Sequence, residues 1–280
     1  MAPDEPDAAD QEPDPEYGKF VRIDLITSQP EKAAAFYEKL LGWTITPVPG
    51  AWTMSPIPGA GPQHFIIENK GQELARIHAM DSGQPIPAGW MSWISVEDID
   101  DMMRDVPANG GSVLAPPSKS ANGRQAVLKG PTGGVFGVVQ LNTNATNDRD
   151  PQPGDFVLSQ LWTKDFEAAL RFYSVMGNYS SINVTFGKTK YSIMQGDGTA
   201  RAVIRQTPPG RATRWIPFVL SSDVDATTKA AKALGATVVT QPREVPTLGS
   251  VVVIEAPTGG VLGFIRPAKS ASEDATAWLP

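Results

Sequence analysis

The sequence predicts an α+β fold in which one unit, a strand followed by a helix and further strands, occurs four times, twice in each half of the chain. Two repeated motifs support this prediction. Phe36-Tyr37 ends an Ala-rich, helix-like segment in the first half, and Phe172-Tyr173 ends a similar segment in the second. Further along, Pro131-Thr-Gly-Gly-Val135 recurs unchanged as Pro257-Thr-Gly-Gly-Val261. Motifs repeated in the same order indicate a duplicated fold.

The first unit of each half is a strand followed by a helix. In residues 20–27, apolar and polar side chains alternate as in a β-strand. Ser28 is expected to cap the next helix, because Glu31 follows it three residues later. The helix is expected over 31–41, where apolar residues have core spacing, and is expected to stop at Gly42. The second half repeats this order, with a strand at 156–163, a helix from 164 to 173 and then Gly177.

The second unit of each half begins with a strand that turns into a helix capped by aspartate. Residues 93–100 match residues 218–225 in this pattern. Each Pro-Thr-Gly-Gly motif then separates two strand-like runs, which predicts a hairpin turn. The order of strand, helix and strands is therefore complete in all four units.

The repeat divides the chain into five parts. Residues 1–17 form an acidic tail that is expected to be disordered, because residues 1 to 16 contain seven acids and no Lys or Arg. A first domain over 18–141 and a second over 154–268 are joined by a linker at 142–153 that is rich in Asn, Asp and Pro. Residues 269–280 form a C-terminal tail.

Composition excludes several classes of function. The sequence has no cysteine, which rules out disulfides and thiolate chemistry, and its only histidines are His64 and His78. No run of Lys or Arg indicates nucleic-acid binding, and the net charge is -6. No apolar stretch approaches the roughly 20 residues of a membrane span, and the acidic N-terminus differs from a secretory signal. A cytoplasmic protein without membrane contact is expected.

These motifs resemble the vicinal-oxygen-chelate superfamily, which has the fold of glyoxalases, bleomycin-resistance proteins and extradiol dioxygenases. The resemblance extends from Phe20 to Pro267. It implies four βαβββ modules paired into two glyoxalase-like domains, each with a curled mixed sheet around a cavity. Because this fold hosts unrelated activities, the resemblance says less about chemistry than about architecture.

Most enzymes of the superfamily that the sequence resembles bind substrate oxygens through a divalent metal. The ligand positions that it implies carry side chains unsuited to that role, namely Arg22, Met91 and Gly137 in the first half and Leu158, Ile216 and Gly263 in the second. We therefore expect no metal and no other cofactor. A relocated metal site would have to use residues from the middle of the first module, among them His64, His78, Glu68 and Glu73.

Alternation along the strands predicts which side chains face the two cavities. Arg22 and Asp24 should face the first cavity, and Gln160 and Trp162 the second, so the first is expected to be polar and charged and the second mostly apolar. An inward-facing Arg and Asp two residues apart have two interpretations. Either Asp24 is a catalytic base or hydrogen-bond acceptor and Arg22 an anchor for an anionic substrate group, or the two form a structural ion pair.

The expected ligand is a small molecule, planar or aromatic, because aromatic and Met side chains are suited to line its pocket. The candidate binding residues are Trp93, Met91, Trp52, Met54, Gln160 and Trp162. One hypothesis is a metal-independent enzyme of small-molecule metabolism that uses acid/base chemistry, such as isomerisation or cyclisation, in the first cavity. The alternative is a non-catalytic protein that sequesters an aromatic drug or metabolite. The protein is expected to be a monomer or a homodimer.

Overall fold

The structure is a computed structural model that describes residues 17–48, 57, 60–80, 86–120, 123–142, 150–207, 210–245 and 248–268. The predicted acidic tail up to residue 16, most of the predicted linker and the C-terminal tail lie outside these ranges, as do Trp52 and Met54. Within the described ranges, no helix has the length and apolar character needed to cross a membrane.

Each half of the chain forms one eight-stranded mixed sheet with two helices. The first half contains β1 (Phe20–Thr27), α1 (Pro30–Leu41), β2 (Thr44–Pro47), β3 (Ala60–Asn69), β4 (Gln72–Met80), β5 (Gly89–Ser95), α2 (Ile99–Ala108), β6 (Ser112–Ser120), β7 (Gly123–Lys129) and β8 (Val135–Leu141). The second half contains β9 (Phe156–Thr163), α3 (Phe166–Met176), β10 (Ser180–Phe186), β11 (Thr189–Gly196), β12 (Thr199–Gln206), β13 (Arg214–Leu220), α4 (Val224–Ala233), β14 (Thr237–Val245), β15 (Gly249–Glu255) and β16 (Val261–Arg266).

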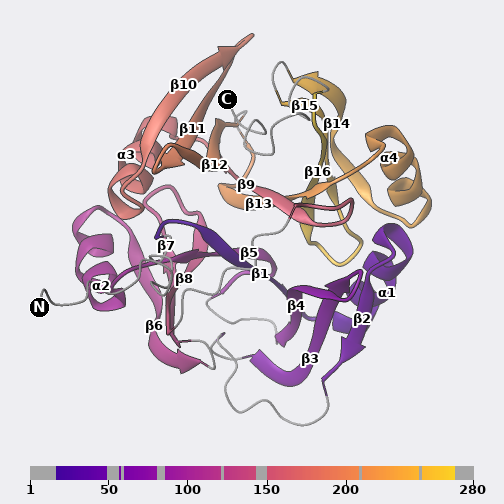
Figure 1. The fold of residues 1–280 in the computed structure, drawn as a ribbon, viewed down its shortest axis with the longest axis horizontal. Helices are drawn as coiled ribbons and strands as arrows, with labels where there is room; N and C mark the ends of the chain where they lie inside the picture. The colour runs from indigo at the N-terminus through magenta and orange to yellow at the C-terminus, as the bar shows by residue number, and fades with distance from the viewer. Residues whose placement is uncertain are drawn as a thin grey trace, which may run out of the picture.

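The strand order confirms the predicted pairing of modules. The first sheet has the order β2-β3-β4-β1-β5-β8-β7-β6, and the second has the equivalent order β10-β11-β12-β9-β13-β16-β15-β14. In each sheet the first strands of the two modules lie antiparallel at the centre, β1 against β5 and β9 against β13. Figure 1 shows the first sheet curling between β3 and β6. The chain is therefore an α+β protein built from four βαβββ modules in two domains.

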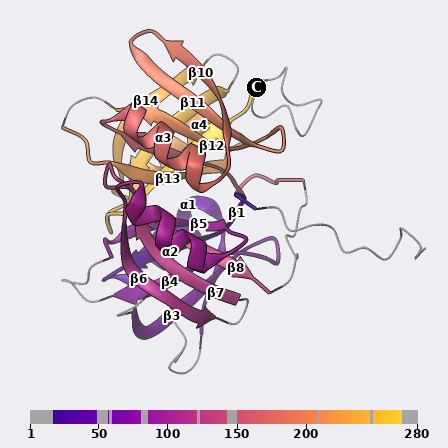
Figure 2. The same ribbon diagram turned by 90° about the vertical axis from the view of Figure 1, so that its left-hand side faces the viewer.

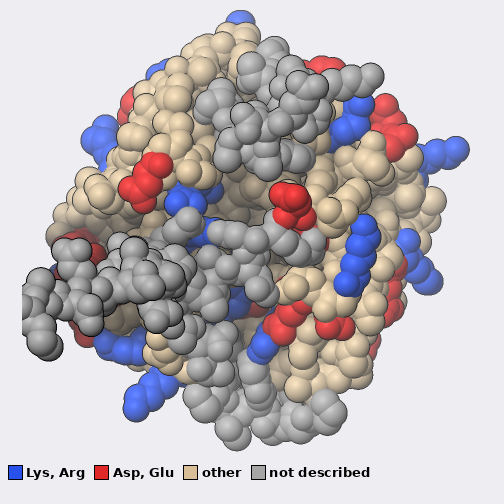
Figure 3. Space-filling view, in the orientation of Figure 1, with Lys and Arg blue, Asp and Glu red and all other residues tan. Residues whose placement is uncertain are grey.

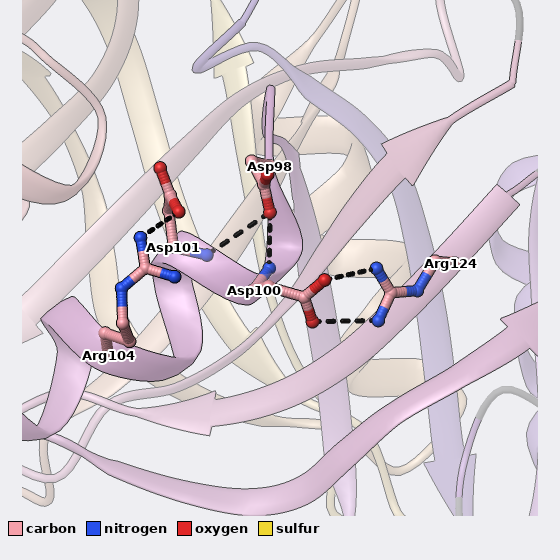
Figure 4. A network of polar contacts seen from close by, with 5 residues as sticks. All are labelled: Asp98, Asp100, Asp101, Arg104 and Arg124. Atoms are coloured by element: carbon pink, nitrogen blue, oxygen red, sulfur yellow. Dashed lines mark hydrogen bonds and ion pairs between the residues drawn. The ribbon is translucent and has the colours of Figure 1, made fainter.

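The first residues of α2 and α1 show which local sequence signals determine where each helix begins. Asp98 caps α2, as the sequence predicted: its Oδ1 accepts from the backbone N–H groups of Asp100 and Asp101 at 2.7 and 3.2 Å (Figure 4). At the start of α1 the prediction of Ser28 as cap is wrong. The cap residue is Gln29, which makes no side-chain cap bond, because the following proline begins the helix with a preset φ.

The two halves share their hydrophobic cores. Helix α1 lies beside α4, α2 lies beside α3, and β5 contacts β13 between them (Figure 1). One core joins Leu25 and Tyr37 of the first half to Phe264 of the second. Figure 2 shows the second half stacked directly on the first. A large apolar interface of this kind makes the two halves one rigid body rather than two independently moving domains.

The repeated Phe-Tyr and Pro-Thr-Gly-Gly motifs meet across this interface. Tyr37 of the first half accepts a hydrogen bond from the indole N–H of Trp90 at 2.9 Å. Its hydroxyl lies so near Gly260, in the turn of the second half, that a Cβ on Gly260 would be 2.8 Å away. Tyr173 takes the reciprocal position, 3.3 Å from a Cβ placed on Gly134, the equivalent glycine of the first half. Glycine at these turns lets the partner half pack closely.

Substituting Gly260→Ala is therefore expected to destabilise the protein by about 1–3 kcal/mol, because the added methyl overpacks the interface around Tyr37. Urea denaturation followed by Trp fluorescence measures the change. Gly61→Ala is the matched control, since its Cβ would meet only Ala79 at an ordinary 3.7 Å. The double variant Gly260→Ala with Tyr37→Phe should recover part of the loss. Equal stability of Gly260→Ala and the control contradicts this packing.

The surface is not dominated by either charge. On the face shown in Figure 3, Lys and Arg are interspersed with Asp and Glu, and neither sign forms a continuous patch over the described part of that face. The features that distinguish one half from the other lie inside the curled sheets.

Candidate functional site

The central strands of the first sheet divide their side chains between two environments. On β1, Ile23 and Leu25 belong to the core shared with the second half. Ile26 belongs instead to a cluster on the opposite face of the sheet, with Met91 and Trp93 of β5. Arg22 and Asp24 have the parity of Ile26, so they lie on the concave face together with those residues. The structure therefore places four of the predicted site residues on one face of the first sheet.

Asp24 lies at the centre of a buried charge cluster, and its exposed fraction is 0%. Its Oδ2 is 3.1 Å from Arg22 Nε, and its Oδ1 is 3.6 Å from His78 Nε2. Burial opposes ionisation and by itself raises the pKa of Asp24, but the charges of Arg22 and His78 outweigh burial and hold the pKa below its usual value. Asp24 is therefore a carboxylate at neutral pH.

Arg22 is held on three sides. Besides its ion pair with Asp24, it donates from Nη2 to Gln125 Oε1 at 3.1 Å. Its Cζ lies 3.8 Å from the centroid of the Trp93 ring, a cation-π geometry. Burial lowers the pKa of Arg22 and the carboxylate of Asp24 opposes that shift. A guanidinium stays protonated under these conditions, so the cluster contains a fixed cation.

His64 and His78 form a pair on the neighbouring strands β3 and β4. Their backbones lie opposite each other in the sheet, both rings are buried, and the two Nδ1 atoms are 3.1 Å apart. Burial, followed by the charges of His78 and Arg76, holds the pKa of His64 below its ordinary value of 6.5. His64 is therefore neutral at neutral pH.

The contacts of these rings define one consistent proton arrangement. If the His78 ring carries one proton, the Asp24 carboxylate favours it on Nε2, and His78 Nδ1 is then an acceptor. His64 Nδ1 is then the donor across the 3.1 Å contact, and its Nε2 carries a lone pair. Asp24, His78 and His64 thus form a continuous array of three polar side chains.

Two further buried donors belong to this part of the fold. Neither the indole N–H of Trp93 nor Nε2 of Gln125 has a hydrogen-bond partner among the described residues. An unsatisfied buried donor costs about 1–3 kcal/mol. A ligand oxygen next to Arg22 would supply acceptors for this set of donors, so the site is suited to a ligand with a carbonyl, phenolate or enolate oxygen.

The sequence analysis predicted some of the residues of this site but not others. The alternation of β1 and β5 led to Arg22, Asp24, Met91 and Trp93. The histidines entered only as ligands of a relocated metal site, and Gln125 was not singled out. The turn after Asn69 was the available signal for a hairpin that brings β3 and β4 together, but it does not reveal the register of the two strands.

Most side chains that line the second cavity are apolar, as expected, but the cavity also contains charged side chains that the sequence analysis did not predict. Gln160 and Trp162 lie on β9 of the second sheet, so they do not share a cavity with Arg22 and Asp24 of the first sheet. Trp162 Nε1 donates a hydrogen bond to Gln160 Oε1 at 2.7 Å. The same cavity is also lined by Arg205, Arg243 and Tyr191. The two arginines were missed because alternation was followed only along β9 and β13, whereas Arg205 lies on β12 and Arg243 on β14.

The metal-ligand positions implied by the resemblance do not fit a divalent cation. Arg22 and Met91 supply no suitable donor, and a Cβ on Gly137 would lie 2.1 Å from the Trp93 ring. The equivalent Cβ on Gly263 would lie 2.5 Å from Phe218. In both halves an aromatic ring fills the place where a ligand side chain would begin. The part of the chain that the structure describes contains no group of three or more His, Asp or Glu placed to hold a metal.

Comparison with known proteins agrees with the fold. Residues 19–137 match the family described as the Glyoxalase/Bleomycin resistance protein/Dioxygenase superfamily. The family model thus matches the first half of the chain, over 119 of its 280 residues. Among solved structures of the superfamily fold, the Mn(II)-bound glyoxalase from Novosphingobium aromaticivorans is similar with a TM-score of 0.61 at 15% identity, covering 90% of this chain and 82% of that one. For 2,2',3-trihydroxybiphenyl 1,2-dioxygenase from Sphingomonas wittichii RW1 the TM-score is 0.62 at 10% identity, with coverage of 89% and 90%.

Two relatives within the superfamily have informative names. The protein named "Putative glyoxylase CFP32" from Mycobacterium tuberculosis is 28% identical over 88% of this chain and 94% of its own length. "Anthracycline biosynthesis protein DauV" from a Streptomyces species is 26% identical over 80% of this chain and 84% of its own. Both matches extend over the two halves of this chain.

Proposed function

We propose that this protein is a metal-independent enzyme that performs acid/base chemistry on a small molecule in the first-domain cavity. The observation that carries the proposal is the buried array of Asp24, His78 and His64 beside a fixed Arg22. Proton transfer within one substrate, as in an isomerisation or a cyclisation, is the reaction class that such an array supports without a cofactor.

The array assigns a different role to each group. Asp24 has too low a pKa to be an effective base at neutral pH, so it acts through its negative charge, 3.6 Å from His78 Nε2, to orient His78. His64 Nε2 is the general base, and the charge that it gains on taking a proton is shared through His78 toward Asp24. Asp24 and His78 are positioning residues in this scheme, and His64 is the catalytic residue.

The remaining donors stabilise the charge that forms on the substrate. When His64 removes a proton from a carbon next to a carbonyl group, negative charge develops on the carbonyl oxygen. Arg22 and the N–H of Trp93 supply a cation and a buried donor for that oxygen. Return of the proton from His64 to another atom of the same molecule completes the isomerisation with no net gain or loss of atoms.

The substrate class follows from the walls of the cavity and from the relatives. Trp93 and Met91 present aromatic and thioether surface next to the charged cluster, a combination suited to planar conjugated molecules. A relative is named for anthracycline biosynthesis. We therefore propose an aromatic ketone or phenol of specialised metabolism as the substrate.

The test uses solvent deuterium exchange into an aromatic polyketide ketone, measured by mass spectrometry with protein freed of metal and its metal content determined. His64→Gln is expected to lower the exchange rate by about 10²–10⁴-fold. Lys70→Gln, an exposed residue at the turn of the same hairpin, is the control and should keep the wild-type rate.

The pH profile follows from His64, which faces His78 and Arg76 of β4 and Asp24 of β1. The rate requires neutral His64, whose pKa lies below 6.5. We therefore expect a constant rate above pH 6.5 that falls as the pH decreases through the pKa of His64. Full activity of His64→Gln, or activity that EDTA removes and a metal restores, would overturn the proposal. Tight binding with no exchange would favour sequestration instead.

A further inference from the structure

The second cavity contains two arginines and no acidic side chain among its lining residues. Arg205 extends from β12 and Arg243 from β14, and Arg243 Nη2 donates to the hydroxyl of Tyr191 on β11 at 2.9 Å. Gln160 of β9 and apolar residues of β13 and β15 complete the walls. Positive charge is therefore gathered inside this cavity without a carboxylate to balance it.

Arg205 is the buried member of the pair, with an exposed fraction of 7%. Its Cζ lies 4.4 Å from the centroid of the Trp162 ring and 5.9 Å from that of Tyr191. Its Nε is buried and has no hydrogen-bond partner among the described residues, and within those residues no carboxylate forms an ion pair with it. A buried cation without a counter-ion is costly, which distinguishes Arg205 from Arg22 with its partner Asp24.

The internal repeat shows that this difference is specific to the second half. In the first sheet, β1 residue Ile26 lies beside His78, which lies opposite His64. In the second sheet, β9 residue Trp162 lies beside Arg205, which lies opposite Tyr191.

The repeat therefore places Arg205 where the first half has His78, Tyr191 where it has His64, and Gln160 where it has Asp24. The carboxylate of the first cavity has become a neutral amide, and an imidazole has become a permanent cation. The second cavity has lost the array that relays protons and gained one that attracts negative charge.

We propose that the second-domain cavity is a binding site for the carboxylate group of a small monocarboxylate, with Arg205 as the buried anchor and Arg243 at the mouth. The guanidinium of Arg205 lies over the Trp162 ring, and its buried Nε has no partner among the described residues, so this donor is available to a ligand oxygen. The cavity, about 20 Å³, has room for little more than one water-sized group, so the carboxylate enters and the rest of the molecule remains at the mouth.

Benzoate is the probe, with benzamide as its neutral counterpart of the same shape. The protein is labelled with 5-fluorotryptophan, and the ¹⁹F resonance of Trp162 is assigned from its disappearance in Trp162→Phe. Benzoate is expected to shift this resonance saturably and to raise the Tm, and benzamide should do neither. Arg205→Met is expected to weaken benzoate binding at least 10-fold.

The controls separate this site from the rest of the molecule. Arg171→Gln, an exposed arginine on α3, should bind benzoate like the wild type. His64→Gln should also bind normally, so failure of the first-domain proposal leaves this one standing. Without ligand, Arg205→Met should keep or increase the Tm, because it removes an unpaired buried charge. Arg205→Lys, which keeps the charge but loses the planar fork, gives weakened binding in a folded protein and supplies the test if Arg205→Met does not fold. An unshifted Trp162 resonance, equal binding of benzamide, or undiminished binding by Arg205→Met would overturn the proposal.

Discussion

Substitution of Asp24 by Asn is expected to destabilise the protein by about 3 kcal/mol, the lower end for breaking a buried ion pair, because it leaves Arg22, whose side chain is 25% exposed, without a counter-ion. The change preserves the shape of the side chain, so the loss reports charge rather than volume. Urea denaturation at pH 7 measures it as a lower midpoint with an unchanged slope.

A matched control and a rescue test the cause. Asp100→Asn removes an exposed carboxylate that pairs with Arg124 at 2.7 and 2.8 Å (Figure 4), and it should lower the urea midpoint much less than Asp24→Asn does. The double variant Arg22→Met with Asp24→Asn should be more stable than Asp24→Asn alone, because the unpaired charge is gone. A loss for Asp24→Asn as small as that of the exposed control would contradict a buried ion pair at the centre of the site.

The same substitution tests Asp24 as a positioning residue. Asn presents an amide where His78 Nε2 has a carboxylate, so the preferred tautomer of His78 is lost and His64 Nδ1 loses its defined acceptor. In the folded variant we expect a lower maximal rate together with a changed pH profile. If the substitution affected only stability, it would lower the amount of folded, active protein and leave the pH dependence of the rate unchanged.

Gly137→Ala is expected to cost about 3 kcal/mol, near the upper end for overpacking, because its Cβ would lie 2.1 Å from the ring of Trp93. Trp93 is fully buried and carries Arg22 on one face, so it has little freedom to move away. Urea denaturation again measures the loss, with Gly61→Ala as the control whose Cβ meets ordinary packing. The loss should fall when Trp93 is also changed to Leu, which removes the ring.

This result bears directly on the metal question. If Trp93 fills the space in which a ligand at position 137 would begin, then Gly137→Glu cannot create a metal site in the presence of Trp93. Stoichiometric metal bound by Gly137→Glu without loss of stability would contradict the filled site and reopen the possibility of metal-dependent chemistry.

Much of the fold was predictable because its signals are local and repeated. Alternation on β1, the glycine that ends α1 with a φ of 68°, the aspartate caps and the Pro-Thr-Gly-Gly turns each depend on a few neighbouring residues. Their recurrence in order revealed four modules. The exception was Ser28, where a capping pattern was read one residue too early because the proline sets the helix start.

The candidate site was predictable only along the strands whose faces were known. Arg22 and Asp24 follow from β1 alone. His64 and His78 do not, because a shift in register between Ile67 and Glu68 is needed to set the two histidines opposite each other. A bulge of this kind depends on packing of the whole sheet, and a one-residue change in register reverses the face of every side chain.

By itself, the sequence determined the architecture, the duplication and the absence of suitable ligands at the metal positions that the resemblance implies. Each of these depends on residue types at short and repeated spacing. Only the tertiary structure decided which charges meet. It placed Asp24 beside His78, which in turn contacts His64. It left Arg205 without an ion pair to a carboxylate among the described residues, and it packed Tyr37 against Gly260 of the other half. These contacts join strands that are far apart in the chain, and their chemistry depends on distances of about 3 Å that no local pattern contains.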